Sequence, residues 1–354
     1  MSWLLNMAAK LLTHRKDGPT MMFVSMVMAV HNGERFLKEA LDHALAQTYP
    51  HLEIIIVNDG STDSTPLILD ELNDPRARVI HLEKNQGAAH ALNVGINNAQ
   101  GDWIAIQDAD DNSYPARIEE QVNYLQQHPS LVGVGTLIHC ISGDVDVPDE
   151  AYEGVKNFKN SNITRRQIRK MIYWGCPLTH SSVMFSKRVF REVGGYEPKF
   201  KIAYDYDLWL KLLEKGDMEV VPKILLDYRI HQSSLSNKNE VRTIDEVQMA
   251  SSTAIYRALV QGKQHEPKVI IIGPEKGCGN YIAKIAPKSG LKVVNMIYKN
   301  RSKQVSEAIR KLKKEKADAI IVLDDDEKQT ILRKLAESRL ILNKDVYVLI
   351  NILK

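Results

Sequence analysis

The chain has 354 residues, of which 44% are hydrophobic and 26% charged, and its formal net charge is +3. This composition is ordinary for a soluble globular protein and excludes a disordered or fibrous chain, and the length allows one large α/β unit and a smaller one. No apolar run approaches the roughly 20 residues of a membrane-spanning helix, no signal peptide is expected, and the widely spaced Cys140, Cys176 and Cys278 favour a reduced, cytoplasmic setting.

Residues 1–21 are expected to form a separate amphipathic segment. Their apolar side chains recur at helical spacing and are followed by the basic residues His14, Arg15 and Lys16. Such a face can lie on the inner surface of a membrane as a peripheral contact. The alternative is that it packs against the rest of the protein or against a partner subunit.

Residues 22–107 alternate between predicted strands and predicted helices. The strands are expected at 22–30, 52–57, 78–82 and 102–107, and the helices at 33–47, 64–73 and 87–99. Strands that alternate with helices of about 10 to 15 residues indicate βαβ units and a parallel sheet. The predicted fold class is therefore α/β, with a mostly parallel sheet and helices on both of its faces.

The second predicted strand ends in Asp59, and Gly60 allows the chain to turn sharply there. Asp59 can then face the ligand crevice and accept a hydrogen bond from a nucleobase N–H or a ribose hydroxyl. The alternative is a strand-to-helix turn in which Asp59 and Asp63 cap backbone N–H groups.

The fourth predicted strand ends in Asp108, Asp110 and Asp111, at the edge where open α/β sheets bind ligands. Alternation along an extended chain puts Asp108 and Asp110 on the same side, with Ala109 facing away. Hard oxygen ligands suit Mg²⁺ or Mn²⁺, which proteins usually hold with one or two carboxylates and the phosphates of a substrate. The pattern therefore predicts a metal site for a nucleotide-diphosphate substrate.

An alternative for the same stretch is an acidic loop that caps the next helix. That helix is expected at 115–127, and Asp111, Asn112 or Ser113 would then be its N-cap. Beyond it, residues 132–140 are predicted to be extended, and 143–162 to form a polar, irregular, substrate-facing loop. The remaining elements expected before residue 263 are helices at 165–172, 206–215 and 239–262, and a strand at 220–228.

A break at 261–267 opens a second α/β pattern, with strands expected at 268–272, 292–298, 319–323 and 346–350. From residue 267 onward 19 Lys and Arg stand against 10 Asp and Glu, a balance of +9, whereas the rest of the chain carries −6. Opposite balances indicate two units with different surfaces. The expected organisation is an N-terminal segment (1–21), a large α/β unit (22–240), a helix and linker (241–266) and a small Rossmann-like unit (267–354).

The small unit contains a glycine-rich turn, 273–280, after its first strand, and such a turn can cradle a phosphate on backbone N–H groups. Pro274 removes one of those donors, and the glycine spacing differs from a dinucleotide fingerprint. Asp324, Asp325 and Asp326 end a later strand. The two alternatives are a bound nucleotide and a docking module, for example one that forms a homo-oligomer.

Taken in order, the motifs of the first part resemble those of family 2 glycosyltransferases of the GT-A fold. The matching runs are AVHNGERFL (29–37), VNDGSTD (57–63), NQG (85–87) with ALN (91–93), DADD (108–111), GGY (194–196) with YDYDLWL (204–210), and YRIH (228–231) with Ser234 and Ser236. The most distinctive are the carboxylate cluster and the stretch from Asp205 to Trp209.

The resemblance implies an inverting transfer of a sugar from a nucleotide diphosphate, with Mn²⁺ or Mg²⁺ on the diphosphate. It assigns Asp110 to the metal, with Asp108 on the ribose or metal side and His231 near the metal or diphosphate. Asp59 matches the position that recognises the base. The positions matched to the donor and its nucleotide are Ala29, Val30, His31, Asn32, Glu34, Asp59, Gly60, Gly87, Asn93, Asp108 and Ala109.

Inversion also requires a base on the face of the sugar opposite the leaving group. Asp205 matches the family's base position, although it can also cap the predicted helix 206–215, and Asp207 is a further candidate. Arg229 could meet a phosphate. His180 is a candidate near the acceptor side, with a structural role as the alternative.

Three residues depart from the family pattern. Ala29 and His31 stand where proline and tyrosine are usual, so the identity of the nucleobase is less fixed. Tyr204 stands where an acidic residue is common, so the base lacks a neighbouring carboxylate.

We therefore expect a metal-dependent glycosyltransferase that uses a UDP-sugar, or less readily a dTDP- or GDP-sugar, and a glycan or lipid-linked acceptor, as in cell-surface polysaccharide synthesis. No nucleic-acid partner is expected. The alternatives are a sugar-phosphate nucleotidyltransferase, for which the glycine- and arginine-rich triphosphate loop is missing, and a degenerate sugar-nucleotide-binding protein without turnover.

Overall fold

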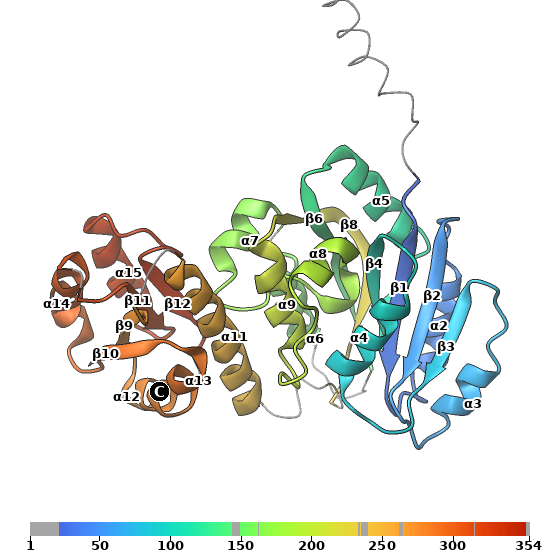
Figure 1. Ribbon diagram of the computed structural model, residues 1–354, viewed down its shortest axis with the longest axis horizontal. Helices are drawn as coiled ribbons and strands as arrows, with labels where there is room; N and C mark the ends of the chain where they lie inside the picture. The colour runs from blue at the N-terminus through green and yellow to red at the C-terminus, as the bar shows by residue number, and fades with distance from the viewer. Residues whose placement is uncertain are drawn as a thin grey trace, which may run out of the picture.

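The computed structural model describes residues 21–143, 149–161, 163–232, 234, 240–261, 265–314 and 316–351. These residues form two sheets (Figure 1): one of eight strands in the order β3-β2-β1-β4-β7-β6-β8-β5, and one of four in the order β10-β9-β11-β12. The predicted amphipathic segment lies outside the described residues except for Met21, and so does Ser236.

Four parallel strands carry the first half of the large sheet. They are β1 (Val24–Val30), β2 (Leu52–Asn58), β3 (Ala77–His81) and β4 (Trp103–Asp108), connected through α2 (Leu37–Leu45), α3 (Thr65–Asp70) and α4 (Ala88–Asn98). β1 lies between β2 and β4, and Ala29 is in register with both Val57 and Asp108. The carboxyl ends of these strands therefore meet at one edge.

Both faces of this half-sheet are buried, as parallel sheets require. Met26 and Met28 pack with Leu37 and the rest of α2 on one face, whereas Val27 packs with Leu92 and the rest of α4 on the other. The predicted α/β class, with a mostly parallel sheet and helices on both faces, is confirmed.

The second half of the large sheet is mixed. Its elements are β5 (Asn112–Ser113), α5 (Arg117–Gln127), β6 (Leu131–Ser142), α6 (Asp149–Lys159), α7 (Arg165–Met171), η1 (His180–Ser182), β7 (Met184–Ser186), α8 (Lys187–Glu192), α9 (Tyr204–Leu213) and β8 (Asp217–Ile230). The short strand β7 is antiparallel to β4 and β6, whereas β6 and β8 are parallel.

The expectation that 143–162 is irregular is wrong over Asp149–Lys159, which is the helix α6. Val155 of this helix packs against a small core that contains Ile138 and Leu226. Tertiary packing of this helix against the sheet therefore outweighs the low helix propensity of Gly154 and the polar residues around it.

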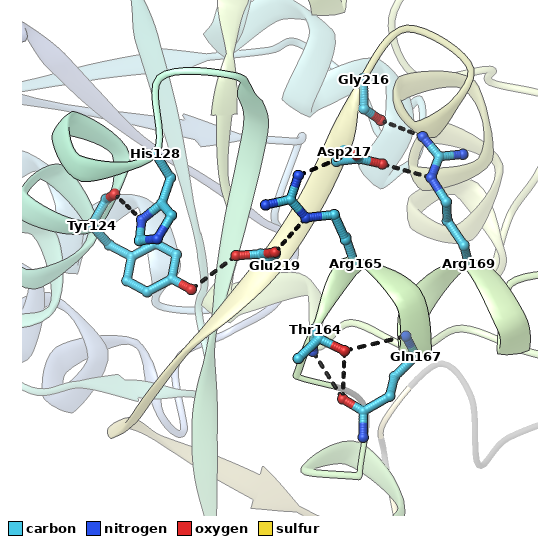
Figure 2. Close-up of polar contacts among 9 residues, drawn as sticks. All are labelled: Tyr124, His128, Thr164, Arg165, Gln167, Arg169, Gly216, Asp217 and Glu219. Atoms are coloured by element: carbon cyan, nitrogen blue, oxygen red, sulfur yellow. Dashed lines mark hydrogen bonds and ion pairs between the residues drawn. The ribbon is translucent and has the colours of Figure 1, made fainter.

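α7 is fastened to the start of β8 by charged and polar side chains (Figure 2). Thr164 and Gln167 form a capping box at its N-terminus. Arg165 Nε donates to Glu219 Oε1 at 2.8 Å, and Tyr124 OH of α5 donates to the other oxygen of that carboxylate at 2.9 Å. Glu219, buried between these two donors, connects three elements.

The second sheet is entirely parallel. Its elements are β9 (Lys268–Ile272), α12 (Glu275–Asn280), the π-helical turn η2 (Tyr281–Ile285), α13 (Ala286–Ser289), β10 (Lys292–Ile297), α14 (Arg301–Lys313), β11 (Ala319–Leu323), α15 (Lys328–Glu337) and β12 (Val346–Leu349). The long helix α11 (Glu240–Val260) runs between the two sheets in Figure 1. Across the described part of the chain, no helix has both the length and the apolarity to cross a membrane.

Candidate active site

The carboxylates of Asp108, Asp110 and Asp111 converge at the carboxyl end of β4. One ligand oxygen from each lies within 4.8 Å of the others. The side chains of Asp108 and Asp110 are 32% and 38% exposed, whereas Asp111 is buried. The cluster offers hard oxygen ligands on the solvent side, as Mg²⁺ or Mn²⁺ requires.

Asp111 is the buried member of the cluster, and two hydrogen bonds fix its carboxylate. Its carboxylate accepts hydrogen bonds from Ser181 Oγ and from the Arg229 backbone N–H, the latter at 2.8 Å. Burial, followed by the charges of Asp110 and Asp108, raises the pKa of Asp111 well above its usual value.

The predicted capping role of Asp111, Asn112 or Ser113 is wrong. α5 begins at Arg117, its N-cap is Ala116, and no side chain caps it. Asn112 and Ser113 instead form the short strand β5, which pairs with β8.

The fully buried Arg117 lies behind the carboxylates. Its Nη1 donates to the carbonyls of Ser181 and Ile106, the latter at 2.9 Å. Burial lowers the pKa of Arg117 to about 10, against the opposing pull of Asp108 and Asp111. Because the Arg117 donors are directed to carbonyl groups, the three converging carboxylates leave room for a divalent cation to balance their charge.

His180 connects the carboxylate cluster to the aromatic side chains of Tyr196 and Tyr204. Its Nδ1 lies 2.8 Å from Asp108 Oδ1 and its Nε2 lies 3.0 Å from the Tyr196 hydroxyl, while its ring meets Tyr204 edge-on at 5.5 Å. Burial disfavours the imidazolium, but Asp108, Asp205 and Asp110 together outweigh it, so the pKa of His180 lies above its usual value. The polar run before β7 is the sequence signal for His180, but nothing in that run distinguishes Ser181, which contacts Asp111.

His231 and Arg229 approach Asp110 from β8 and the residue after it. His231 Nε2 lies 2.9 Å from Asp110 Oδ2. The Arg229 guanidinium contacts the Asp110 carbonyl at 2.8 Å, the Ser142 carbonyl at 3.2 Å and Glu39 at 2.8 Å. Each nitrogen of the Arg229 guanidinium has a protein partner, so this side chain holds the backbone around Asp110 and Ser142. A phosphate would have to displace those partners.

Asp205 is the second residue of α9, whose N-cap is Ala203, so the predicted start at 206 with Asp205 as the cap is wrong. Its Oδ1 accepts from the Tyr206 N–H at 2.7 Å, and its Oδ2 lies 3.7 Å from the Cys176 thiol. Burial raises the pKa of Asp205 above its usual value, against the opposing effects of His180, the Tyr206 N–H and Lys159.

Asp207 has different surroundings. It is 2% exposed and pairs with Lys211 Nζ at 2.6 Å, one turn further along α9. The structure thus separates the two aspartates of this motif.

Asp59 lies at the end of β2 with both carboxylate oxygens engaged. They accept from the backbone N–H groups of Gln86 and Gly87 at 2.9 and 2.8 Å. Gly60 has φ +62°, and a Cβ there would lie 2.5 Å from backbone atoms of Lys84 and Asn85. Asp59 therefore fixes the turn before α4, and not the strand-to-helix turn of the capping alternative, where Asp63 accepts from the Thr65 N–H at 3.0 Å. Gly60 permits the close approach of the two loops.

The loop after β1 is fastened to the loop after β2. His31 Nδ1 lies 2.9 Å from the Asp59 carbonyl, Asn32 Oδ1 accepts from the Thr62 N–H at 2.8 Å, and Glu34 Oε2 accepts from the Ser64 N–H at 2.9 Å. The matched positions Ala29 and Val30 precede this loop on β1 and pack in the cores on opposite faces of the sheet.

The matched position Asn93 lies elsewhere. Its side chain pairs with both backbone groups of Tyr196, at 2.8 and 3.0 Å. This pair holds the turn at 194–196 against α4.

A groove of about 360 Å³ lies between α6 and the end of β8, where Tyr228 and Ile230 flank Arg229, the partner of Asp110 and Asp111. It is lined by Gly154, Val155, Phe158, Lys159, Tyr228, Ile230 and Ser234. Lys159 Nζ lies 5.0 Å above the Tyr228 ring, and the charge of Lys159 also acts on Asp205. Phe158 of the groove contacts Trp174 at 5.6 Å, and Cys176, two residues after Trp174, lies 3.7 Å from Asp205, so the segment 174–176 connects the groove to Asp205.

The model of the family described as "Glycosyl transferase family 2" matches residues 25–194. An uncharacterized glycosyltransferase of Rickettsia typhi is 32% identical over 224 residues, which are 60% of this chain and 66% of that protein. EpsE of Bacillus subtilis, which is named as a glycosyltransferase, is 31% identical over 203 residues, 54% of this chain and 67% of that protein. The match covers just under two thirds of the Rickettsia typhi protein and 38% of one from Rickettsia felis.

Two solved structures have a similar fold. Residues 1–349 of Staphylococcus aureus TarS in complex with UDP-GlcNAc align with a TM-score of 0.55 at 17% identity, over 90% of this chain and 80% of that one. The mannosyltransferase PcManGT of Pyrobaculum calidifontis, in complex with GDP-Man and Mn²⁺, aligns with a TM-score of 0.51 at 21% identity, over 74% and 72%. At these identities the likeness shows the fold.

Proposed function

The chain belongs to glycosyl transferase family 2, and from that premise we propose that it transfers a sugar, with inversion, from a nucleotide diphosphate to a hydroxyl group of a glycan or lipid-linked acceptor. The observation that carries the proposal is the placement of His180, which contacts Asp108 at 2.8 Å and meets the ring of Tyr204, the residue before Asp205, at 5.5 Å. Donor-side carboxylates and a candidate base therefore belong to one site.

The residues at the end of β4 fit a divalent cation. Asp108 and Asp110 would hold Mn²⁺ or Mg²⁺, with His231 beside Asp110 and Asp111 beneath them. When bound, such an ion neutralises the charge that develops on the leaving diphosphate. The fixed hydrogen bonds of Asp111 keep the carboxylates in place without reorganisation.

Asp205 is the proposed base. It would take the proton of the acceptor hydroxyl as that oxygen bonds to the anomeric carbon and the bond to the diphosphate breaks. Its raised pKa brings the carboxylate nearer to the working pH, where general bases act best. The groove along α6 and β8 would admit the acceptor to the side of the site that carries Asp205.

A UDP-sugar is the preferred donor, because TarS, which has a similar fold, is seen with UDP-GlcNAc. GDP-Man, seen in PcManGT, supports a GDP-sugar as the second choice. A sugar-phosphate nucleotidyltransferase and a binding protein without turnover remain as alternatives.

The test is a screen of UDP-, GDP- and dTDP-sugars for thermal stabilisation and donor hydrolysis, with Mn²⁺, with Mg²⁺ and with a chelator. We expect one nucleotide class to stabilise and turn over only when metal is present. Asp110→Ala should abolish both effects, whereas Asp70→Asn, at an exposed ion pair with His81, should not. Metal-independent turnover, or full activity of Asp110→Ala, would remove the metal from the proposal.

A further inference from the structure

The carboxyl end of the second sheet is covered by a side chain from the first part of the protein. β9 and β11 are neighbours there, and such a switch point is where open parallel sheets bind ligands. Asp324 follows β11, and its Oδ2 accepts from Trp174 Nε1 at 2.6 Å. Lys328 Nζ lies 2.6 Å from the other oxygen of Asp324 and 5.4 Å above the indole ring.

Trp174 belongs to the segment 172–178, which runs from this contact to the proposed base. Next to it, Tyr173 meets Tyr347 of β12 edge-on at 4.9 Å. Two residues further on, the Cys176 thiol lies 3.2 Å from the Leu178 carbonyl and 3.7 Å from Asp205 Oδ2. Trp174 also contacts Phe158 of the acceptor groove at 5.6 Å.

The segment 172–178 is held near its start by backbone hydrogen bonds and near its end by the contacts of Cys176. Only the Cys176 contact with Asp205 belongs to the proposed active site. The Ile172 carbonyl accepts from the Tyr206 hydroxyl of α9, and the Tyr173 carbonyl accepts from Ser251 of α11 at 3.1 Å. Beyond these backbone contacts, the Trp174 side chain is held by its hydrogen bond to Asp324 and by ring contacts with Lys328 and Phe158, and the hydrogen bond alone fixes the direction of the indole N–H. Freeing that side chain would loosen the segment between Tyr173 and Leu178, which carries the thiol.

We infer that Trp174 is a positioning residue, through which Asp324 of the second sheet holds Cys176 against Asp205. The inference rests on the proposed function, because it takes Asp205 as the base. It gives the C-terminal sheet a role in the transfer reaction, since the strand end that could have bound a nucleotide binds the active-site segment instead.

Two pairs of variants test this in the full chain. Trp174→Phe removes the indole N–H and Asp324→Ala removes its acceptor, whereas Asp324→Asn keeps an acceptor oxygen. Glu327→Gln is the matched control, because Glu327 pairs with Arg301 in the same unit. The first readout is the alkylation rate of Cys176 by iodoacetamide, resolved from Cys140 and Cys278 by peptide mass spectrometry, and it requires no activity.

We expect Trp174→Phe and Asp324→Ala each to accelerate alkylation about tenfold, and the double variant to be no faster than the faster single, because both remove one hydrogen bond. Asp324→Asn and Glu327→Gln should stay within about twofold of the parent. An unchanged alkylation rate in both Trp174→Phe and Asp324→Ala, with folding intact by circular dichroism, would overturn the inference.

The second readout is the pH profile of kcat with the donor found in the screen. The single proton of the Cys176 thiol is shared between the Leu178 carbonyl and Asp205. Loss of this contact weakens donation to the ionised carboxylate, so the acid limb should move to higher pH. The other groups that face Asp205, namely His180, Lys159 and Asp108, are unchanged. We expect kcat to fall about tenfold, as misplacement can cause, with the donor KM within about twofold.

The outcomes separate the two proposals. If Cys176 is alkylated faster but kcat and the acid limb of its pH profile are unaltered, the positioning role of Trp174 is overturned and the proposed function stands. Faster alkylation in a protein that turns over no donor would support the junction and reject the proposed function.

Discussion

Asp205 and Asp207 stand two positions apart in one helix, yet their surroundings give them different chemistry. Asp205 is contacted by a thiol and a single backbone N–H, whereas Asp207 is paired with a lysine. A paired, buried carboxylate is a poor proton acceptor, because the cation stabilises its charged form. The two residues therefore offer a matched comparison.

We expect Asp205→Asn to lower the transfer rate roughly 10²- to 10⁴-fold, the usual contribution of a general base, while donor affinity is retained. Asp207→Asn should lower Tm, because Lys211 would lose its partner, and should leave kcat within a few-fold of the parent. Initial rates and titration calorimetry with the donor measure both. Retained transfer by Asp205→Asn would remove it as the base.

The charge of Asp111 predicts a pH dependence of metal binding. A raised carboxyl pKa means that this group favours folding most below its unfolded value of about 4. That contribution is lost as the pH rises toward the folded value. A bound cation offsets the repulsion among ionised carboxylates, so Mn²⁺ should raise Tm more near pH 7 than near pH 5.

Thermal melts with and without Mn²⁺ at the two pH values measure this effect. Asp111→Asn should reduce the difference between them, because it removes the ionising group and keeps an acceptor for the Arg229 N–H. An Mn²⁺ increment in Tm that is equal at both pH values would contradict the role of Asp111, and no increment at either pH would contradict the assignment of the cluster to a metal.

At the scale of elements, the backbone conformation of two glycines decides whether replacement by alanine raises or lowers the free energy of unfolding. Gly60 has φ +62° and no room for a Cβ, whereas nothing lies within 4 Å of the position that a Cβ would take at Gly154 in α6. We expect Gly60→Ala to destabilise the protein by about 1–3 kcal/mol, the cost of a strained backbone. Gly154→Ala should stabilise it by about 0.5–1 kcal/mol. Denaturant unfolding measures both, and equal signs would contradict the argument.

The sequence predicted the elements of the parallel half-sheet because its strands are long, apolar and separated by periodic helices. It could not predict β7 or α8, because three and six residues are too short to show a period. The buried state of Asp111 was also beyond reach, since its partners Ser181 and Arg229 lie 70 and 118 positions away. Motif order located the carboxylates, whereas the contacts that distinguish them depend on tertiary structure.

At the scale of the whole molecule, α11 contributes to both cores. Ala250 and Ala254 pack in the core of the large sheet, whereas Ile255 and Leu259 pack in the core of the small one. Peripheral membrane contact and self-association through the C-terminal unit stay predictions, as do the proposed unit boundaries at 22–240 and 267–354.

This shared helix, together with the Trp174 and Tyr173 contacts, predicts that the two sheets unfold as one cooperative unit. We expect a single calorimetric transition whose van't Hoff and calorimetric enthalpies agree. Ile255→Ala, which removes a fully buried side chain from the small sheet's core, should lower that whole transition by about 2–5 kcal/mol. The fluorescence of Trp209, in the other core, should shift with it. Two separate transitions, or an early melt of the C-terminal sheet with Trp209 unchanged, would show that α11 does not couple them.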